Sequence, residues 1–282
     1  MNFDIYLRLI DLYKDQGYTI DTGAFPWHFD KVYPLAYTFF HRRLPFPSLR
    51  KEGKALSMGQ GIGFSELMLI GHCAQKHQAQ NIFIIGNAFG WSTFALLLSC
   101  PQANIVVIDN FQEGTQSHLG HELSLRIKEK QQFEQLHLIR ASSPQDVAKT
   151  AAEYFPNRKS DFVLIDGNHT NEQLLLDFAA VQQITHSKHI VFLHDILNFN
   201  MTKAFVQLRS QYPHLEQRML LRTPSGMAVF FSKDIDSQVQ QAIEAFHMPK
   251  ETIQETQRYV RNKVRDFEEA HQFSLKLNIP KD

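Results

Sequence analysis

The sequence has no excess of charge of either sign, few cysteines and no long apolar run. Its 29 Lys and Arg residues balance 29 Asp and Glu residues, which removes the electrostatic reason to expect a nucleic-acid or anionic-membrane partner. No window approaches about 18 uncharged apolar residues, so no transmembrane helix is expected. The two cysteines, Cys73 and Cys100, lie in apolar stretches and are expected to be buried free thiols.

The first residues also lack the pattern of a secretory signal. Asp4 and Arg8 place charges in the stretch that would have to be apolar. We therefore expect a cytoplasmic protein. What the sequence does contain in quantity is apolar surface: 43% of its 282 residues are hydrophobic and 23 are Phe, enough for a full globular core. The 14 His residues are many for this length, and we expect some of them near the chemistry.

Short apolar runs alternate with helical stretches through the middle of the chain. This alternation is typical of a parallel sheet covered by helices on both faces, an α/β fold. Two further apolar runs, separated by Thr223-Pro224-Ser225-Gly226, predict a closing antiparallel hairpin. The predicted strands are residues 81–85, 104–108, 136–139, 161–165, 189–193, 218–222 and 227–231, with helices expected over 91–100, 117–132 and 201–212 and others starting at Ser143 and Thr170.

Two segments flank this predicted core of residues 56–233. Residues 1–55 are rich in aromatic side chains and are expected to be a helical or lid segment. The part around residues 25–29 with Tyr33 and Tyr37 is expected to form either a substrate lid or an ordinary packing arm. Residues 234–282 are expected to be helical. Their stripe at helical spacing should pack against the core or against a second copy of the chain, as in a homodimer. The stripe consists of Val260, Val264, Phe267 and His271.

The clearest binding signal is the turn between the run 81–85 and the helix after it. Gly86 and Gly90 allow a ligand to approach the backbone, and the helix N-terminus supplies free amide donors. Asp109 ends the next predicted strand, where a carboxylate can accept hydrogen bonds from both hydroxyls of a ribose. Each feature alone is also typical of a turn without a ligand. Their order, strand, glycine turn, helix, strand and acid, favours an adenosine-containing cofactor.

Two more side chains are candidates for the adenine. Phe111 could cover the base and Ser142 could reach its edge, although a core phenylalanine and a turn hydroxyl are equally good interpretations. A richer glycine segment, Gly59-Gln60-Gly61-Ile62-Gly63, follows no apolar strand and is expected instead to open a helix over residues 65–76. The predicted cofactor residues are Gly86, Asn87, Ala88, Gly90, Ser92, Asp109, Asn110, Phe111, Ser142 and Asp166.

A second group of polar side chains follows the strands 161–165 and 189–193. Asp166, His194 and Asp195 stand at strand ends that should be neighbours, where ligands bind in open parallel sheets. Together they could hold a divalent cation such as Mg²⁺ or Mn²⁺. His169 directly precedes the expected helix cap Thr170 and is suited to taking a proton near neutral pH. Single residues of these types are usually structural. It is their joint placement that favours a catalytic site with His169 and Asp166.

The order of these segments resembles class I S-adenosylmethionine (SAM)-dependent methyltransferases, and most closely the bacterial group labelled methyltransferase family 24. The resemblance covers about residues 57–232. The order of the segments is also similar to that of catechol-type and macrolide-sugar O-methyltransferases. It implies a Rossmann-like, doubly wound, mostly parallel seven-stranded sheet with the closing hairpin. It rests on the segments Ile85-Gly-Asn-Ala-Phe-Gly-Trp-Ser92, Val107-Ile-Asp109, Phe162-Val-Leu-Ile-Asp-Gly-Asn-His169 and Val191-Phe-Leu-His-Asp195.

The resemblance also implies roles for individual residues. Gly86, Asn87, Gly90 and Ser92 would bind the methionyl end of SAM and Asp109 its ribose, while Asp166 and His194-Asp195 match Mg²⁺ ligands and His169 matches the base. Two positions depart from the usual pattern: Ile84 stands where an acid is common, and His194 replaces a carboxylate.

The sequence therefore predicts an enzyme that methylates a hydroxyl of a small molecule, with SAM as cofactor and His169 as general base. A nicotinamide-dependent oxidoreductase is the alternative enzyme class, although the closing hairpin and the missing Gly-x-Gly-x-x-Gly after the first strand count against it. A non-catalytic SAM-binding or scaffold protein is the third alternative. The acceptor stays open between a phenol, a sugar hydroxyl, a lipid and an amine.

Overall fold

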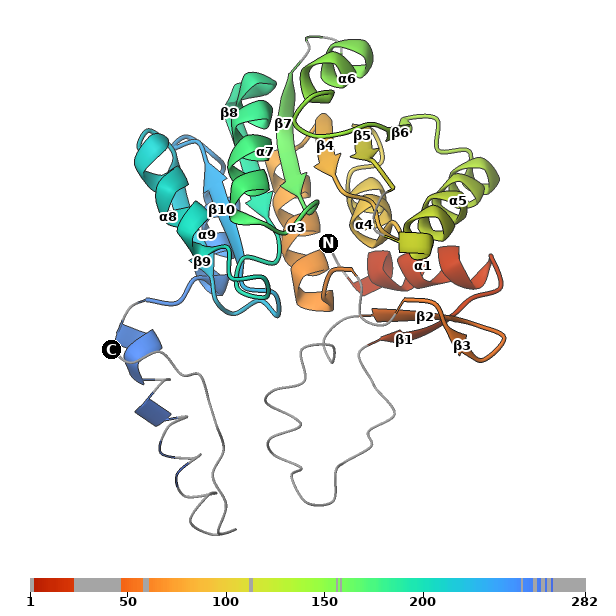
Figure 1. Cartoon of the computed structure of the whole chain (residues 1–282), viewed down its shortest axis with the longest axis horizontal. Helices are drawn as coiled ribbons and strands as arrows, with labels where there is room; N and C mark the ends of the chain where they lie inside the picture. Colours follow the sequence, from red (N-terminus) through yellow and green to blue (C-terminus); the bar gives the residue numbers. More distant parts are fainter. Residues whose placement is uncertain are drawn as a thin grey trace.

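The computed structural model describes residues 3–22, 47–57, 61–111, 114–155, 157, 159–249, 251–255, 258–259, 262 and 265. Their centre is a seven-stranded sheet with the strand order β6-β5-β4-β7-β8-β10-β9 (Figure 1). The strands from β4 to β8 are parallel, and β10 runs antiparallel to both β8 and β9. The predicted fold class and the closing hairpin are confirmed. The strands are β4 (Asn81–Ile85), β5 (Asn104–Asp109), β6 (Leu136–Arg140), β7 (Ser160–Ile165), β8 (Thr185–Leu193), β9 (Glu216–Leu220) and β10 (Met227–Phe231).

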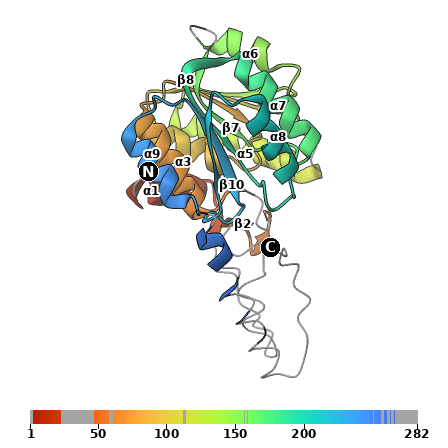
Figure 2. The ribbon, with the colours of Figure 1, turned by 90° about the vertical axis from the view of Figure 1, so that its left-hand side faces the viewer.

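Apolar, mostly branched residues form the middle of this sheet because both of its faces are covered. β4 and β7 are buried along nearly their whole length, whereas the edge strands β6 and β9 are polar and only partly buried. One face carries α1 (Phe3–Lys14), α3 (Phe64–His77), α4 (Trp91–Ser99) and α9 (Ser237–Phe246), and α5 (Gly114–Gln131) adds to the same apolar layer. The other face carries α6 (Val147–Tyr154), α7 (Asn171–Gln183) and α8 (Thr202–Gln211) (Figure 2).

The register of the parallel strands aligns their carboxyl ends in one row. Ile85 of β4 pairs with Ile108 of β5 and with Ile165 of β7, and Ile165 pairs with Leu193 of β8. The residues that follow these ends, Gly86, Asp109, Asp166 and His194, therefore lie along the same edge of the sheet. This is the edge at which open α/β sheets bind ligands.

The N-terminal segment contributes α1 and a small antiparallel sheet of β1 (Thr19–Thr22), β2 (Pro47–Lys51) and β3 (Lys54–Ala55). The aromatic residues 25–29, Tyr33 and Tyr37 lie outside the described residues, as do Val260, Val264, Phe267 and His271. The expected division at residues 55 and 233 stays a prediction.

Local details differ from the sequence-based expectation in the N-terminal segment, where β1 to β3 form a sheet, and at the start of one helix. α6 begins at Val147 and not at Ser143, because the Ser143 hydroxyl donates to Asp177 (2.5 Å) instead of capping a helix, and residues 143–146 form a turn. Thr170 does cap α7, its hydroxyl accepting from Gln173 N. Gly63 opens α3, as the alternative interpretation of the glycine-rich segment predicted.

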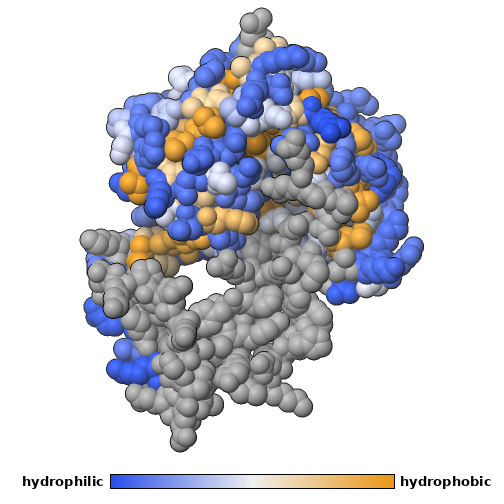
Figure 3. Space-filling model, in the orientation of Figure 1, coloured by the Kyte–Doolittle hydropathy of each residue, from blue (hydrophilic) through white to orange (hydrophobic). Residues whose placement is uncertain are grey.

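The expectation for the two cysteines is confirmed. Cys73 and Cys100 are buried free thiols, and burial raises the pKa of each to about 12. Within the described part of the chain, no helix is long and apolar enough to cross a membrane. On the face of the molecule shown in Figure 3, the surface of the described residues is largely hydrophilic, with smaller hydrophobic areas among the hydrophilic ones.

Candidate cofactor and active site

The turn after β4 can be formed only with glycine at its first position. Gly86 has a φ of 95° and donates its N–H to Ile108 O. A Cβ at this position would lie 2.0 Å from the carbonyl oxygen of Asp166. The β4 turn is thus in direct backbone contact with the end of β7. Gly90, with a φ of 81°, is the N-cap of α4, and no side chain caps this helix. The amides at the start of α4 are therefore available to an anionic group.

Asn87 holds this turn from inside. Its side-chain oxygen accepts from the Thr93 hydroxyl at 3.0 Å, and its Nδ2 donates to Ser124 Oγ at 3.1 Å and to Ala88 O at 3.3 Å. The side chain is 4% exposed. Asn87 therefore holds the shape of the turn, and its side chain is occupied by these contacts. The partner helix α5 approaches so closely that a Cβ on Gly120 would lie 2.0 Å from Ala88 O.

Asp109 ties the turn to the loop after β5. Oδ2 accepts from Asn87 N at 2.8 Å, and Oδ1 accepts from Phe111 N at 2.8 Å. Each oxygen keeps a further lone pair for a ligand hydroxyl. Phe111 is buried with its ring centre 4.1 Å from that of His121, and Asn110 lies between it and Asp109. Ser142, after β6, donates its N–H to Asp146 and sits in the turn before α6.

Helix α1 braces the same turn from the outer side. The buried ring of Tyr13 stacks on Trp91 with centroids 4.3 Å apart, and its hydroxyl donates to Phe89 O at 2.8 Å. Burial raises the pKa of Tyr13 well above its ordinary value, so the hydroxyl keeps its proton as a donor. At the sequence level, the aromatic character of the N-terminal segment was the one signal for this role.

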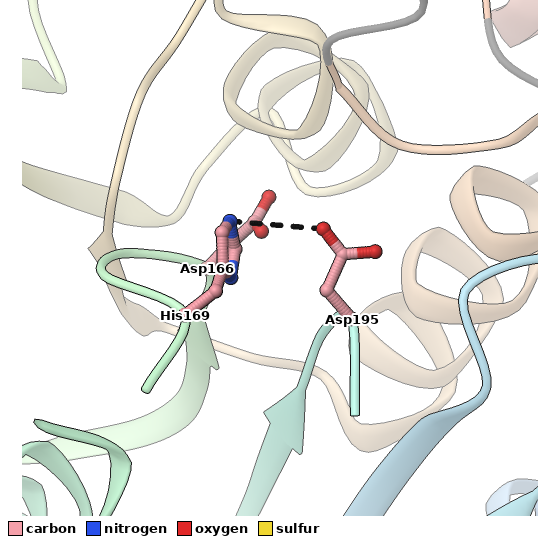
Figure 4. Close-up of side chains that lie close together, drawn as sticks. All are labelled: Asp166, His169 and Asp195. Atoms are coloured by element: carbon pink, nitrogen blue, oxygen red, sulfur yellow. Dashed lines mark ion pairs between the residues drawn. The ribbon is translucent and has the colours of Figure 1, made fainter. Parts of the chain in front are cut away.

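Asp166, His169 and Asp195 converge at the carboxyl ends of β7 and β8 (Figure 4). One ligand atom of each lies within 4.8 Å of the others, and all three are half-buried. His169 Nε2 is 3.6 Å from Asp195 Oδ2. The His169 ring stacks on Phe199 with centroids 4.3 Å apart. This group can take up a proton, hold a hydroxyl or hold a cation.

His194 lies beneath this group and does not join it. Its Nε2 is 3.1 Å from Glu66 Oε2, and its Nδ1 is 2.9 Å from Asp166 Oδ1 and 3.5 Å from Asp195 Oδ2. Burial alone would lower the pKa of His194, but the carboxylates of Asp166 and Glu66 outweigh burial and hold that pKa well above its ordinary value. The ring is thus an imidazolium between carboxylates. Of the predicted metal set, the structure groups Asp166 and Asp195 with His169, whereas both nitrogen atoms of His194 face other partners.

Glu66 was missed at the sequence level. It is fully buried near the start of α3 and accepts hydrogen bonds from Gly63 N, Ser225 N and Ser225 Oγ as well as from His194. Burial would raise the pKa of Glu66, but the charge of His194 and the Ser225 hydrogen bonds lower it below its ordinary value. One signal was present: Glu66 is the sole acid in the apolar helix segment of residues 64–74.

Comparison with known proteins agrees with this geometry. Residues 83–196 match the family model described as a methyltransferase domain. By this match, residues 83–196 are a methyltransferase domain. The sequence-based recognition of a SAM-dependent methyltransferase of the O-methyltransferase-like type is confirmed. A search of curated protein sequences finds no match to the chain.

Solved structures share the fold of this methyltransferase domain at low identity. An O-methyltransferase from Bacillus cereus in complex with SAH has a TM-score of 0.50 at 12% identity, over 61% of this chain and 83% of its own. A putative caffeoyl-CoA O-methyltransferase from Staphylococcus aureus has a TM-score of 0.51 at 14% identity, over 82% of this chain and 100% of its own. A spermidine synthase from Thermotoga maritima has a TM-score of 0.52 at 13% identity, over 74% and 79%. Because different reactions occur on this fold, the acceptor has to be argued from the site.

Proposed function

We propose that the chain transfers the methyl group of SAM to a hydroxyl oxygen of a small molecule. The observation that carries this proposal is the contact between the two halves of the site. The Cα of Gly86 packs against the backbone of Asp166, so the glycine turn that would hold SAM adjoins the group of Asp166, His169 and Asp195. A bound cofactor and a proton acceptor would then lie at one edge of one sheet, and alignment of two reactants is a large part of catalysis in such transfers.

The residues present fit SAM. The uncapped N-terminus of α4, with Ser92 in its first turn, suits the methionyl carboxylate. Gly86 and Gly90 allow the positive φ values of the turn and its close packing against Asp166 and Phe94. Asp109 would accept from the ribose hydroxyls through its remaining lone pairs. The adenine would lie near Asn110, Phe111 and Ser142, the predicted binding residues of the loops after β5 and β6. Ala88 would act through its backbone, and Asn87 would act by holding the shape of the turn. When bound, SAM would supply an electrophilic methyl group.

The strand-end residues would handle the acceptor. His169 is partly exposed, so it can take the hydroxyl proton, and Asp195, 3.6 Å from its Nε2, would stabilise the charge that forms on the ring. The carboxylate of Asp166 would orient the hydroxyl. Stacking on Phe199 fixes the plane of the His169 ring. These contacts support the roles of His169 and Asp166 that the sequence predicted.

The same donors also suit a divalent cation, Mg²⁺ or Mn²⁺. Two carboxylates and one imidazole lie close enough to share an ion, which would lower the pKa of a bound hydroxyl. Asp166, Asp195 and His169 would hold it. His194, a ligand in the predicted set, would first have to leave Glu66 and Asp166. His169 cannot be a metal ligand and the base through the same nitrogen, so the two versions are distinguishable.

Binding and turnover measurements test the proposal. Calorimetry with SAM, its demethylated product and NAD should show binding of the first two; binding of NAD alone would favour the oxidoreductase alternative. Transfer of labelled methyl groups from SAM should then be measured with catechol, a phenolic acid and a set of free sugars as acceptors. SAM binding without transfer to any hydroxyl acceptor would favour the alternative of a SAM-binding or scaffold protein.

Variants then test the assigned roles. His169→Gln should bind SAM like the wild type and lose about 10²-fold or more in kcat. The control is His214→Gln, at an exposed histidine near the end of α8, which should behave like the wild type. Equal kcat in both variants would exclude His169 as the base. Loss of activity in chelator, restored by Mn²⁺, would favour the metal version, and unchanged activity would exclude it.

A further inference from the structure

Glu66 is anchored to two different elements at the active-site edge. It stands at the start of α3, and its Oε1 accepts from both the backbone N–H and the hydroxyl of Ser225, at 2.8 and 2.5 Å. Its Oε2 accepts from Gly63 N at 2.8 Å and from His194 Nε2 at 3.1 Å. Four donors converge on one fully buried carboxylate. Two chains of contacts connect this carboxylate to the proposed catalytic group of Asp166, His169 and Asp195.

The first route passes through His194. The imidazolium lies with Nε2 on Glu66 and Nδ1 2.9 Å from Asp166 Oδ1, so its ring spans the space between α3 and the end of β7. The Nδ1 contact is an ion pair without the alignment of a hydrogen bond. Asp195 Oδ2 lies 3.5 Å from the same nitrogen. A shift of Glu66 would therefore move the His194 ring, whose Nδ1 both carboxylates face.

The second route passes through Ser225 in the loop between β9 and β10. Its carbonyl oxygen accepts from Leu197 N at 3.2 Å and Asn198 N at 3.4 Å, while Asn198 Nδ2 donates to Asp195 Oδ1 at 2.7 Å. Asp195 has a φ of 59°, a conformation that a non-glycine residue keeps only where its surroundings enforce it. Ser225 thus links Glu66 to the turn that holds Asp195.

A buried ion pair is a poor way to add stability, because burying both charges costs about as much as their attraction returns. Apolar side chains would fill the space between α3, β8 and the hairpin at lower cost. What Glu66 and His194 add is defined geometry: each has fixed partners on both sides, and these contacts hold both carboxylates of the site in defined positions.

We propose that Glu66 is a positioning residue for methyl transfer, holding Asp166 through His194 and Asp195 through Ser225. This inference rests on the proposed function, since the two carboxylates would orient the acceptor and support His169. Glu66 itself is enclosed by α3, the end of β8 and the hairpin loop, and touches no reactant. Glu66 would affect methyl transfer only through the positions of Asp166 and Asp195.

Glu66→Gln is the variant that tests the proposal. It keeps the shape of the side chain and one acceptor oxygen for Ser225, but it places an amide donor where Gly63 N–H and His194 now donate. The matched control is Asp161→Asn. Asp161 also accepts backbone N–H groups, from Gln80 and Asn81, but at the opposite edge of the sheet. Ser225→Ala is a second variant, since it removes the hydroxyl and keeps the backbone N–H.

We expect kcat of Glu66→Gln to fall about 10- to 100-fold. Its Kd for SAM should stay within about threefold of the wild type, because the cofactor turn is not touched. Crystal structures should show Asp166 or Asp195 displaced by about 1 Å in Glu66→Gln and in the same place in Asp161→Asn. Ser225→Ala should lower kcat in the same direction by a smaller factor.

Three results would overturn the proposal. The first is a kcat of Glu66→Gln equal to that of Asp161→Asn, and the second is unmoved carboxylates. The third is a parallel collapse of kcat, SAM affinity and Tm, which a merely structural role would give. If Glu66→Gln does not fold, Ser225→Ala decides by the same measurements. Wild-type protein that neither binds SAM nor methylates a hydroxyl contradicts the proposed function instead, and the crystal comparison still decides whether Glu66 positions the two carboxylates.

Discussion

Gly86 shows how one missing side chain determines the shape of the site. Gly86→Ala would add a Cβ 2.0 Å from Asp166 O in a conformation with a φ of 95°. We expect the turn to be pushed away from β7, with loss of SAM binding and a large fall in Tm. Calorimetry with SAM and thermal unfolding measure the two effects.

A matched glycine separates the backbone strain from the close contact. Gly17 has a φ of 80°, yet nothing lies within 4 Å of a Cβ added there. Gly17→Ala should therefore cost only the strain of the left-handed conformation, about 1–2 kcal/mol, and leave SAM binding intact. Equal destabilisation of the two variants would mean that the contact between the turn and Asp166 is looser than described.

Phe199 is the residue we expect to stabilise His169 in the plane needed for proton transfer. Phe199→Ala removes the stacked ring, and aromatic pairs of this kind contribute about 0.5–1.5 kcal/mol. We expect kcat to fall by roughly 2- to 13-fold. Leu176→Ala is the control, because Leu176 on α7 is equally exposed, at 52%, and lies in no contact with His169 that the structure records. A fall no greater than in Leu176→Ala would contradict the role of Phe199.

Which residues were predictable from the sequence depends on how near their partners are. Gly86, Asp109 and Asp166 could be predicted as site residues because each stands at the end of a predicted strand. Glu66 does not, because its partners His194 and Ser225 are 128 and 159 residues away along the chain. Only the three-dimensional structure shows that Glu66, His194 and Ser225 lie in contact.

At the scale of elements, α1 is the brace of the cofactor turn. Tyr13→Phe would leave Phe89 O without the hydroxyl that donates to it at 2.8 Å, while the stacking on Trp91 would remain. Because the carbonyl is enclosed, we expect a loss of about 1–3 kcal/mol. The Kd for SAM should rise, since Phe89 lies in the proposed binding turn. Chemical denaturation and calorimetry measure these changes.

Tyr18→Phe provides the comparison for this variant. The Tyr18 hydroxyl accepts from Arg126 at 3.3 Å, a longer contact on the same side of the molecule but away from the turn. Its removal should cost less and leave SAM binding unchanged. If Tyr13→Phe binds SAM as tightly as Tyr18→Phe, α1 stabilises the fold without supporting the cofactor turn.

Most elements were predictable because their apolar periods are strong. The predicted strands overlap β4 to β10, although β8 begins four residues and β9 two residues earlier than predicted. The start of α6 was wrong for a physical reason. Ser143, Pro144 and Asp146 form a good local helix start, but the Ser143 hydroxyl is bonded to Asp177 on α7. The tertiary hydrogen bond to Asp177 thus outweighed the local preference for a helix start at Ser143. The N-terminal sheet was not foreseen either, since its strands β1 and β2 are far apart in sequence.

At the scale of the whole molecule, the sheet separates stability from chemistry. Its two faces bury separate apolar layers under α1, α3, α4 and α9 and under α6, α7 and α8. The carboxyl edge of the sheet instead holds buried polar groups. Five histidines on the helices α3 and α5 and the strands β6 and β8 are partly or fully buried, and we expect them to make the fold as a whole sensitive to acid. Burial lowers the pKa of each of them; they are His72, His77, His121, His137 and His189.

His77 is the clearest of these histidines, because burial and the charge of Lys188 lower its pKa to about 4. Its Nδ1 is buried without a hydrogen-bond partner among the described residues. Between pH 4 and 6.5, the ordinary pKa of histidine, His77 is protonated in the unfolded chain and neutral in the folded chain. The free energy of unfolding must then rise with pH through this window, so the stability is present above about pH 6.5 and is lost as the pH falls toward 4.

Chemical denaturation at several pH values between 7.5 and 5 measures this dependence, and His77→Gln should flatten it. Burial also raises the pKa of Asp161 and Asp177, which acts in the opposite direction, but these groups are present in both proteins and cancel in the difference. His214→Gln, at an exposed histidine, should leave the slope unchanged. If His77→Gln loses stability on acidification as steeply as the wild type, the other buried histidines and not His77 cause the acid sensitivity of this fold.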